Sequence, residues 1–438
     1  MNFKNFLWNF LKKLSSLSIS IIMLLSIALV SILGTIIEQD QSIEYYKLNY
    51  PGDRPLFYFF TWKQIIYWNL NHVYSNVWFI VLLLLFFISL FVCTMSTQLP
   101  ILKRSRQWKF FYNKTSLNKF IFSSRVEGKS FINFIYLLNL KNYYVFHKGN
   151  AIYSYKGLLG RIAPIFVHSS IIFTLTGAFI GLFGGFFAQE MIPVGEIFHF
   201  QNIVRSGYIS KFPGDMLAKV NNLKISYNQN NSIQQFFSNL SILDNQGIVI
   251  YSKTISVNNP LRFRGLTFYQ TDWQINALRV RLGSRYLLEK SLNKIVKEDT
   301  LSTVWFCNLF LSADHQVSII VTDLKDSILI YDNDGTLITQ TKYGLWNVVY
   351  GVPIVIQDLM TSTGLQIKVD PGIQVTYFGF LILMISIATS YQSFSQVWAN
   401  SNNNTLYFGG FTNRAFLLFE DEISLIYKTY INLSNSLD

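Results

Sequence analysis

The chain has 438 residues, of which 50% are hydrophobic and 14% are charged, and its formal net charge is +12. This balance excludes an ordinary soluble globular protein and is typical of a membrane protein with a large extramembrane portion. The charge alone allows a nucleic-acid partner, an anionic membrane surface, or loops retained on the negative side of a bilayer. Cys93 and Cys307, the two cysteines, form no CxxC pair, so neither a disulfide framework nor a dithiol relay is predicted.

Four apolar stretches are each long enough to cross about 30 Å of hydrocarbon as a helix. In chain order they are residues 17–37, 77–95, 162–187 and 373–390. The first follows Lys12 and Lys13, as the apolar region of a signal peptide would. Its run is too long for such a region and no A-x-A site follows it, so we expect a retained helix.

The charges of the loops predict the orientation of these helices. Residues 96–161 hold 12 Lys and Arg against one acidic residue, whereas residues 38–76 hold three against four. The positive-inside rule places residues 1–16, 96–161 and 391–438 on the cytoplasmic or stromal side. The excess charge is therefore mainly one retained loop, and no nucleic-acid partner is expected. Within the tail, the polar run at 399–405 is expected to be flexible.

Residues 188–372 are expected on the opposite side of the membrane and carry 16 basic against 15 acidic residues. Short alternating runs, such as GIVIYSKTISV and QVSIIVTDL, are separated by the turn signals DNQG and DNDG. This pattern predicts a large β-rich extramembrane domain, a sandwich or an open barrel. The predicted fold class is a membrane protein with four transmembrane helices and this domain between the third and the fourth.

His168 lies inside the third apolar stretch. An ionisable residue in a spanning helix costs a few kcal/mol, so its presence is by default a functional hypothesis. The structural alternative is a neutral imidazole that bonds a neighbouring helix, beside Ser169 and Ser170. At 100° per residue, bulky apolar residues share the direction of His168 within about 40°, and glycines cluster about 180 to 260° away. The apolar set is Ile172, Leu175, Phe179, Leu182 and Phe186, and the glycine set is Gly177, Gly181 and Gly185.

The glycine face suits close packing against another helix, which leaves the histidine face for a different partner. A neutral imidazole above an apolar, aromatic stripe is suited to axial ligation of haem iron. A proton relay would also suit it, but relays need further titratable groups at bilayer depth. The four stretches contain no Asp, Glu, Lys or Arg, which favours haem ligation.

The other histidines lie outside the apolar stretches. His72 precedes the second stretch and His199 follows the third, so both could approach a ligand near the far membrane surface or be plain interfacial residues. His147 lies in the basic loop and His315 in a turn-like ADHQ sequence. A structural role is favoured for these two.

The order of the four stretches, the β-rich region, VHSSIIFTLTG at 167–177 and VNNPLRFRGLTFYQTDW at 257–273 together resemble the ResB-type proteins of System II cytochrome c biogenesis. The resemblance implies a membrane partner with a tryptophan-rich WWD motif, haem carried in transit, and delivery to the CxxCH site of apocytochromes c. His168 matches the family's transmembrane haem-ligating histidine. The second motif implies no chemical role, although Arg262 and Arg264 could meet haem propionates or form a solvated strand edge.

The chain lacks a WWD-like motif, so the resemblance implies that the haem-presenting surface belongs to the partner and that the isolated chain has no catalytic activity or catalytic residue of its own. Two alternatives stay open: a scaffold that binds the apocytochrome without touching haem, and a b-type redox protein, which would need a second intramembrane ligand. Since no transit peptide is recognised, we expect a chain that is encoded in an organelle or in a bacterium. The composition, rich in Phe, Ile, Asn and Lys, favours a plastid-encoded thylakoid protein with its β-rich domain in the lumen, or a cyanobacterial or other bacterial membrane protein.

Overall fold

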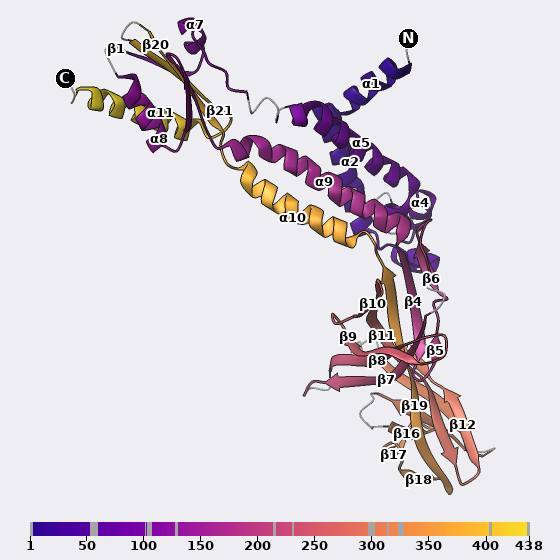
Figure 1. The fold of residues 1–438 in the computed structure, drawn as a ribbon. Coiled ribbons are helices and arrows are strands. Elements are labelled where there is room, and N and C mark those ends of the chain that lie inside the picture. Colours follow the sequence, from indigo (N-terminus) through magenta and orange to yellow (C-terminus); the bar gives the residue numbers. More distant parts are fainter. Residues whose placement is uncertain are drawn as a thin grey trace. The chain divides into compact units, whose positions relative to one another are not determined.

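The computed structural model describes residues 3–52, 60–100, 102, 107–127, 130–212, 216–229, 232–296, 303–312, 315–322, 328–402 and 405–435. The chain divides into two compact units. The first unit comprises residues 1–179 and 373–438, and the second comprises residues 180–372. Figure 1 shows the elements of both in sequence colours.

Among the residues that the structure describes, four helices are long and apolar enough to cross a membrane, in agreement with the predicted spans. They are α2 (Leu17–Ile36), α5 (Val77–Cys93) with its continuation η2 (Thr94–Gln98), α9 (Leu158–Gly184) and α10 (Ile373–Ser390). α9 begins and ends earlier than the apolar run suggested, because Leu158–Arg161 already form its first turn and Phe186 begins a strand.

Shorter helices surround α2 and α5 in the first unit. They are α1 (Phe3–Leu14), α3 (Ile43–Asn49), α4 (Trp62–Tyr67) and η1 (Leu70–Ser75). The Ser20 and Ser89 hydroxyls lie 2.8 Å apart between α2 and α5, and Ser89 also donates to the carbonyl of Leu14. These polar contacts are satisfied internally, as a helix pair in hydrocarbon requires. The loop between the two spans folds around buried Tyr46 and Ile65.

The basic loop and the C-terminal tail form one domain within the first unit. Its antiparallel sheet has the order β1-β21-β20-β3-β2. The strands are β1 (Phe122–Glu127), β2 (Tyr144–Lys148), β3 (Ala151–Lys156), β20 (Ser395–Asn402) and β21 (Thr405–Thr412). Helices α8 (Phe131–Leu140) and α11 (Phe416–Asn435) cover a core that includes Phe134, Phe408 and Tyr430. The short α7 (Lys114–Leu117) joins a second aromatic cluster around Trp398.

The expectation of a flexible run at 399–405 is wrong for the residues that the structure describes. Residues 399–402 belong to β20, and Thr405 begins β21; residues 403–404 lie outside the described residues. β20 pairs with β3 on one side and with β21 on the other, so its polar sequence is held by backbone hydrogen bonds on both edges.

The helices next to these two paired strands also lie close together at one end. β3 ends at Lys156 and α9 begins at Leu158, while α10 ends at Ser390 shortly before β20 begins at Ser395. A Cβ at Gly157 or Gly160 would clash with the backbone carbonyls of Ser393 and Gln392. The start of α9 and the end of α10 are therefore held together by a contact between backbones that only glycine permits.

The second unit consists of three antiparallel sheets. The central sheet contains β4 (Phe186–Pro193), β6 (Ile203–Ser206), β10 (Leu261–Phe263), β11 (Leu266–Leu282), β12 (Tyr286–Ser291), β18 (Trp346–Val349) and β19 (Val352–Val369). A four-stranded sheet contains β5 (Ile197–Phe198), β7 (Leu217–Tyr227), β8 (Ile233–Leu243) and β9 (Val249–Ser256). The third contains β13 (Asn293–Val296), β14 (Thr303–Phe310), β15 (Gln316–Val321), β16 (Ile328–Asp332) and β17 (Leu337–Thr341).

The long strands β11 and β19 serve two hydrophobic cores in succession. The first core lies between one half of β11 and β19 and the four-stranded sheet. It includes Leu240, Ile255, Phe268 and Ile367. The second lies between their other half and the β13–β17 sheet, and includes Leu278, Ile319 and Ile356. The predicted β-rich domain is confirmed as several antiparallel sheets, and among the described residues no sheet closes into a barrel. The DNQG and DNDG turns occur as predicted, with Gly247 and Gly335 at positive φ.

A buried polar cluster joins β8, β11 and β19. Gln270 Nε2 donates to Ser238 Oγ at 2.6 Å and to Thr363 Oγ1 at 3.2 Å, and the two hydroxyls lie 2.9 Å apart. All three side chains are buried. Because buried polar groups are costly when unpaired, this cluster fixes how the three strands face one another. Gln270, part of the motif for which the sequence implied no role, thus has a structural one.

Replacing Gln270 by Ala should therefore destabilise the second unit. The change removes two buried hydrogen bonds and leaves a cavity, and we expect a loss of about 1–3 kcal/mol. Thermal unfolding of the detergent-solubilised chain, followed by the far-ultraviolet signal of its β-structure, measures the shift. Gln234→Ala, at an exposed position of β8, is the control and should leave the midpoint unchanged. Equal midpoints for the two variants would contradict a stabilising role of the cluster.

The pairing of β3 with β20 also predicts the sidedness of labelling. Single cysteines at Lys148 and Glu420, both exposed in one domain, should react from the same side of sealed vesicles with a membrane-impermeant maleimide. A cysteine at Asn245, in the β8–β9 turn, should react from the other side, because α9 and α10 each cross once. The background carries Cys93→Ser and Cys307→Ala. Labelling of Lys148→Cys and Glu420→Cys from opposite sides would contradict the pairing.

Candidate functional site

The surface of α9 has three faces, of which two pack against other segments of the chain. One face packs against α10: a Cβ at Gly379 would lie 2.5 Å from Thr174 Oγ1 and 2.7 Å from Thr174 N. Thr174 and Ser170 lie about 240° and 200° from His168 around the helix, which is the direction of the predicted glycine face. Gly181 and Gly185 continue that face and approach Asp370 and Val369, at the end of β19. The glycine face therefore meets this chain's own segments.

A second face of α9 packs against α2 and α5. Ile171, Ile172 and Leu175 contact the cluster of Met23, Phe86 and Leu90. Phe179 meets Phe87 of α5 edge to face, with ring centroids 6.1 Å apart. Helices of the same chain thus cover part of the stripe that was predicted to contact a porphyrin, at Ile172, Leu175 and Phe179. Phe186 is buried in the first core of the second unit.

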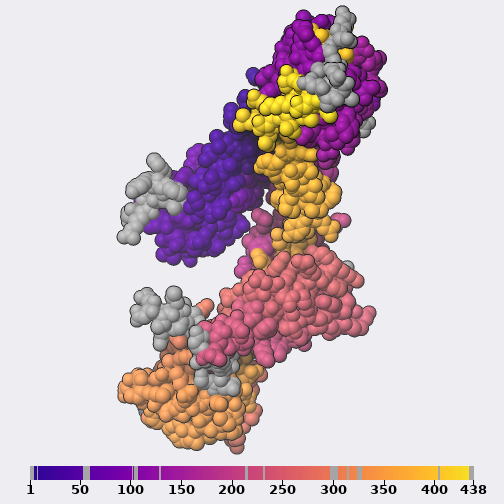
Figure 2. Space-filling model, turned by 90° about the vertical axis from the view of Figure 1, so that its left-hand side faces the viewer, coloured from indigo at the N-terminus to yellow at the C-terminus, as the bar shows by residue number. Residues whose placement is uncertain are grey.

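The third face of α9 is open and continues onto α10. Phe166, Phe173 and Ile180 of α9 are exposed, and Phe173 meets Phe378 of α10 edge to face. The outer surface of α10 also carries exposed Met384, and Figure 2 shows this helix in orange, uncovered along its length. Such a surface suits lipid chains or the helix of a partner.

His168 lies one turn before Ile172, where the packed face of α9 begins. Its imidazole is half-buried, and Nδ1 is buried without a hydrogen-bond partner among the residues that the structure describes. Ser169 and Ser170 do not bond it; Ser170 Oγ instead donates to the carbonyl of Val167. An imidazole nitrogen left unpaired at this depth is an uncompensated cost, and a metal ion is one group that could use the free lone pair of such a ring.

The two other candidate histidines have polar partners. His72 Nδ1 lies 2.5 Å from Asp40 Oδ1, and the ring lines a cavity of about 230 Å³ with Asn69, Ser75 and Asn76. A carboxylate on one ring nitrogen orients the imidazole and leaves Nε2 for a ligand, an arrangement common beside metal-bound histidines. His199 is exposed and accepts from Gln201 Nε2 at 3.1 Å.

His315 and His147, for which a structural role was favoured, differ in their contacts. His315 stacks on Tyr350, with ring centroids 4.3 Å apart, and His147 is exposed on β2. The described residues contain no group of three or more His, Cys, Asp or Glu able to hold a metal ion. Burial raises the pKa of the Cys307 thiol to about 11, so this cysteine is protonated and unreactive near neutral pH.

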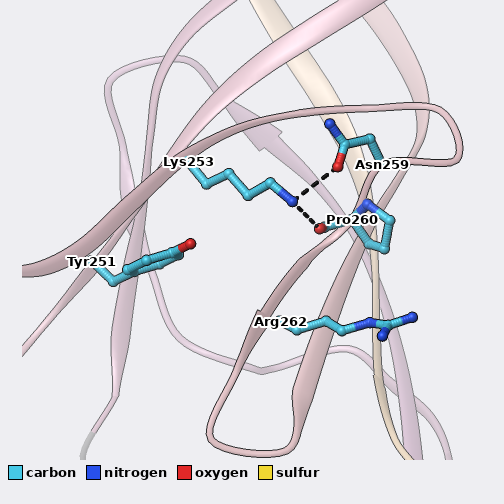
Figure 3. A pocket seen from close by; sticks show the side chains of 5 residues that line it. All are labelled: Tyr251, Lys253, Asn259, Pro260 and Arg262. Atoms are coloured by element: carbon cyan, nitrogen blue, oxygen red, sulfur yellow. Dashed lines mark hydrogen bonds between the residues drawn. The ribbon is translucent and has the colours of Figure 1, made fainter.

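The structure separates the two arginines of the second motif. Arg264 lies over the Phe263 ring, 5.3 Å from its centroid, where the backbone turns at Gly265. Arg262 instead lines a cavity of about 320 Å³ with Tyr251, Lys253, Asn259 and Pro260 (Figure 3). Sequence reasoning named the arginines but missed Lys253 and Tyr251, because they belong to β9, which precedes the motif.

Comparison with known proteins matches the chain over nearly its whole length. A family model described as the ResB-like family covers residues 17–320 and 322–424. A protein of Gracilaria tenuistipitata var. liui named "Cytochrome c biogenesis protein Ccs1" is 47% identical over 98% of this chain and 99% of its own length. A protein of the same name from Porphyra purpurea is 43% identical over 96% of both chains. "Cytochrome c biogenesis protein CcsB" of Microcystis aeruginosa is 41% identical over 94% of this chain and 93% of its own.

The close approach of α9 and α10 predicts that Gly379→Leu will separate the helices. The new side chain meets the backbone of α9 rather than a flexible group, so we expect a destabilisation of about 1–3 kcal/mol. The thermal midpoint of the solubilised chain measures it. Ala388→Leu, on an exposed part of α10, is the matched control and should have no effect. A native midpoint for Gly379→Leu would contradict the contact.

Proposed function

The chain belongs to the ResB-like family, and we propose that it is a membrane subunit that supports the biogenesis of c-type cytochromes, with His168 as a haem ligand inside the bilayer. The observation that carries the proposal is the imidazole of His168, which lies in an apolar helix with its Nδ1 buried and unpaired among the described residues. The names of the relatives point to the same pathway.

Haem is the cargo in this proposal, and the chain holds it in transit. A ring nitrogen of His168 supplies one axial ligand. The exposed Phe166 and Phe173 lie about 160° and 140° around the helix from His168, so they do not form the wall beside that ligand. The stripe of Ile172 and Leu175 is partly covered by α2 and α5, so only its uncovered part is open to the porphyrin. The cargo therefore has to approach His168 from the side that these two helices leave open.

A partner is needed to complete the site. The described residues offer no second histidine at the depth of His168, and the chain contains no tryptophan-rich WWD-type motif. The exposed apolar surfaces of α9 and α10 could receive helices of a WWD-type membrane partner, which would bring the second ligand and present haem to apocytochromes c. His72, oriented by Asp40, and the exposed His199 are candidate contacts for haem after it leaves the bilayer.

The charge distribution supports an orientation with the basic domain on the cytoplasmic or stromal side. The β-rich unit would then meet apocytochromes on the opposite side, where c-type cytochromes mature. Relatives from red algae and cyanobacteria favour a plastid thylakoid membrane, with that unit in the lumen, or a cyanobacterial membrane.

A scaffold that binds the apocytochrome without touching haem is the second candidate. The packing of Ile172, Leu175 and Phe179 against helices of the same chain favours it, because His168 then lies next to a face that is already filled. The two candidates differ in one property, the iron ligation by His168.

The visible absorption spectrum of the chain co-purified with its WWD-type partner tests that property. His168→Gly should lose most of the haem bands, and added imidazole should restore them by occupying the vacated space. His147→Gly, at an exposed position of the basic domain, is the control and should keep the native spectrum. An unchanged spectrum for His168→Gly would reject the haem-ligand proposal and leave the scaffold.

A further inference from the structure

Two edge strands of different sheets meet at one end of the first core of the second unit. β9 is the last strand of the four-stranded sheet, and β10 is the outer strand of the central sheet beside β11. The turn 257–260 joins them, with Ser256 bridged to Asn259. Among the described residues, β9 pairs otherwise only with β8 and β10 only with β11, so the sandwich has an open mouth between these two strands.

The inward-facing residues of β9 become more exposed from the core toward this mouth. Ile255 is fully buried, Lys253 is intermediate, and Tyr251 and Val249 are 42% and 54% exposed. Ile255, Lys253 and Tyr251 alternate along the strand and therefore lie on the same face, whereas a bulge precedes Tyr251 and interrupts the alternation at Val249. The core thus ends at Ile255, and the continuation of its inner wall is a cavity of about 320 Å³.

The cavity is cationic, and one of its cations is held in place. Lys253 Nζ donates to Asn259 Oδ1 at 2.9 Å and to the carbonyl of Pro260 at 2.7 Å, which leaves its third proton for a ligand. Figure 3 shows Lys253 directed toward Asn259 and Pro260 of the turn, and Arg262 extending in the same direction with its guanidinium away from Tyr251. The guanidinium of Arg262 has no ion-pair or hydrogen-bond partner among the residues that the structure describes.

An aromatic surface lies beside the two cations. The Tyr251 ring stacks on Phe263 across the mouth, with centroids 6.0 Å apart and planes at 21°. Arg264 lies over Phe263, which stabilises this ring pair and removes Arg264 from the cavity. The exposed part of Tyr251 is therefore a flat, partly apolar surface next to two anion-binding groups.

We propose that this mouth binds a carboxylate that is attached to a flat apolar ring system. Lys253 and Arg262 pair with the carboxylate, since a guanidinium and an oriented ammonium are strong donors to it, and the ring system lies against Tyr251. If the proposed function is correct, on which this identification of the ligand rests, the ligand is the propionate edge of haem. The mouth is then a holding site for haem outside the membrane.

Fluorescence titration of the full chain in lipid nanodiscs with zinc protoporphyrin IX tests the proposal. The double variant Lys253→Gln and Arg262→Gln should raise the Kd about tenfold or more, because two charge-assisted contacts are lost. The conservative pair Lys253→Arg and Arg262→Lys should keep most of the affinity. The matched control is Lys224→Gln with Arg281→Gln, which removes two positive charges of the same unit outside the cavity. An equal Kd for the double variant and this control would overturn the proposal.

Two further probes separate the features of the ligand. The dimethyl ester of zinc protoporphyrin IX lacks carboxylates, so it should bind weakly and show the same Kd in native chain and double variant. Glutarate, a dicarboxylate without a ring system, should fail to displace the porphyrin at millimolar concentration. Tight ester binding would show that the cations do not contribute, and displacement by glutarate would reject the role of Tyr251 in favour of a general carboxylate site, such as one for acidic polypeptides.

The same titrations in a His168→Gly background keep this inference apart from the proposed function. A charge-dependent site that persists in that background belongs to the mouth and not to α9. Loss of the haem bands in His168→Gly, together with no effect of the double variant, would leave the proposed function intact and overturn the mouth as a holding site. The reverse result would keep the mouth and reject His168.

Discussion

The backbone pairing of β3 with β20 is the constraint on which the arrangement of the chain depends. It joins residues that are more than 200 positions apart and brings the start of α9 next to the end of α10, where Gly157 and Gly160 allow the backbones to touch. β4 and β19 pair in the same antiparallel sense directly after α9 and directly before α10. Within the first unit, the pairing of β3 with β20 thus sets the start of α9 against the end of α10.

The sequence alone predicts the elements whose signal is local. Four apolar runs of sufficient length reveal the spans, and alternation with glycine-containing turns reveals the sandwich strands. The domain built from residues 96–161 and 391–438 was not predicted, because its sheet forms between segments separated by two spans and the whole second unit. The polar run at 399–402 has little intrinsic strand preference, and its structure comes from two long-range partners, β3 and β21.

The sequence also predicted only part of the candidate site on α9. Helical periodicity correctly separates the glycine face of α9 from the histidine face, and the glycine face packs closely as expected. Periodicity does not say which neighbour covers a face. In the structure, α2 and α5 cover part of the stripe that was assigned to a porphyrin. His168 lies beside this packed face, and its Nδ1 has no hydrogen-bond partner among the residues that the structure describes. Packing alone therefore does not explain the imidazole. An apolar contact would satisfy the helix equally well without an imidazole, and the proposed haem ligand would account for its presence.

A structure of the chain in complex with the proposed WWD-type partner and bound haem would test the central claim, that the imidazole of His168 binds haem within the bilayer. The account predicts continuous density between the haem iron and a ring nitrogen of His168, with the porphyrin on the side of α9 that α2 and α5 leave open. Haem bound in the complex but ligated only by residues of the partner, with the imidazole of His168 packed against a neighbouring helix, would contradict it.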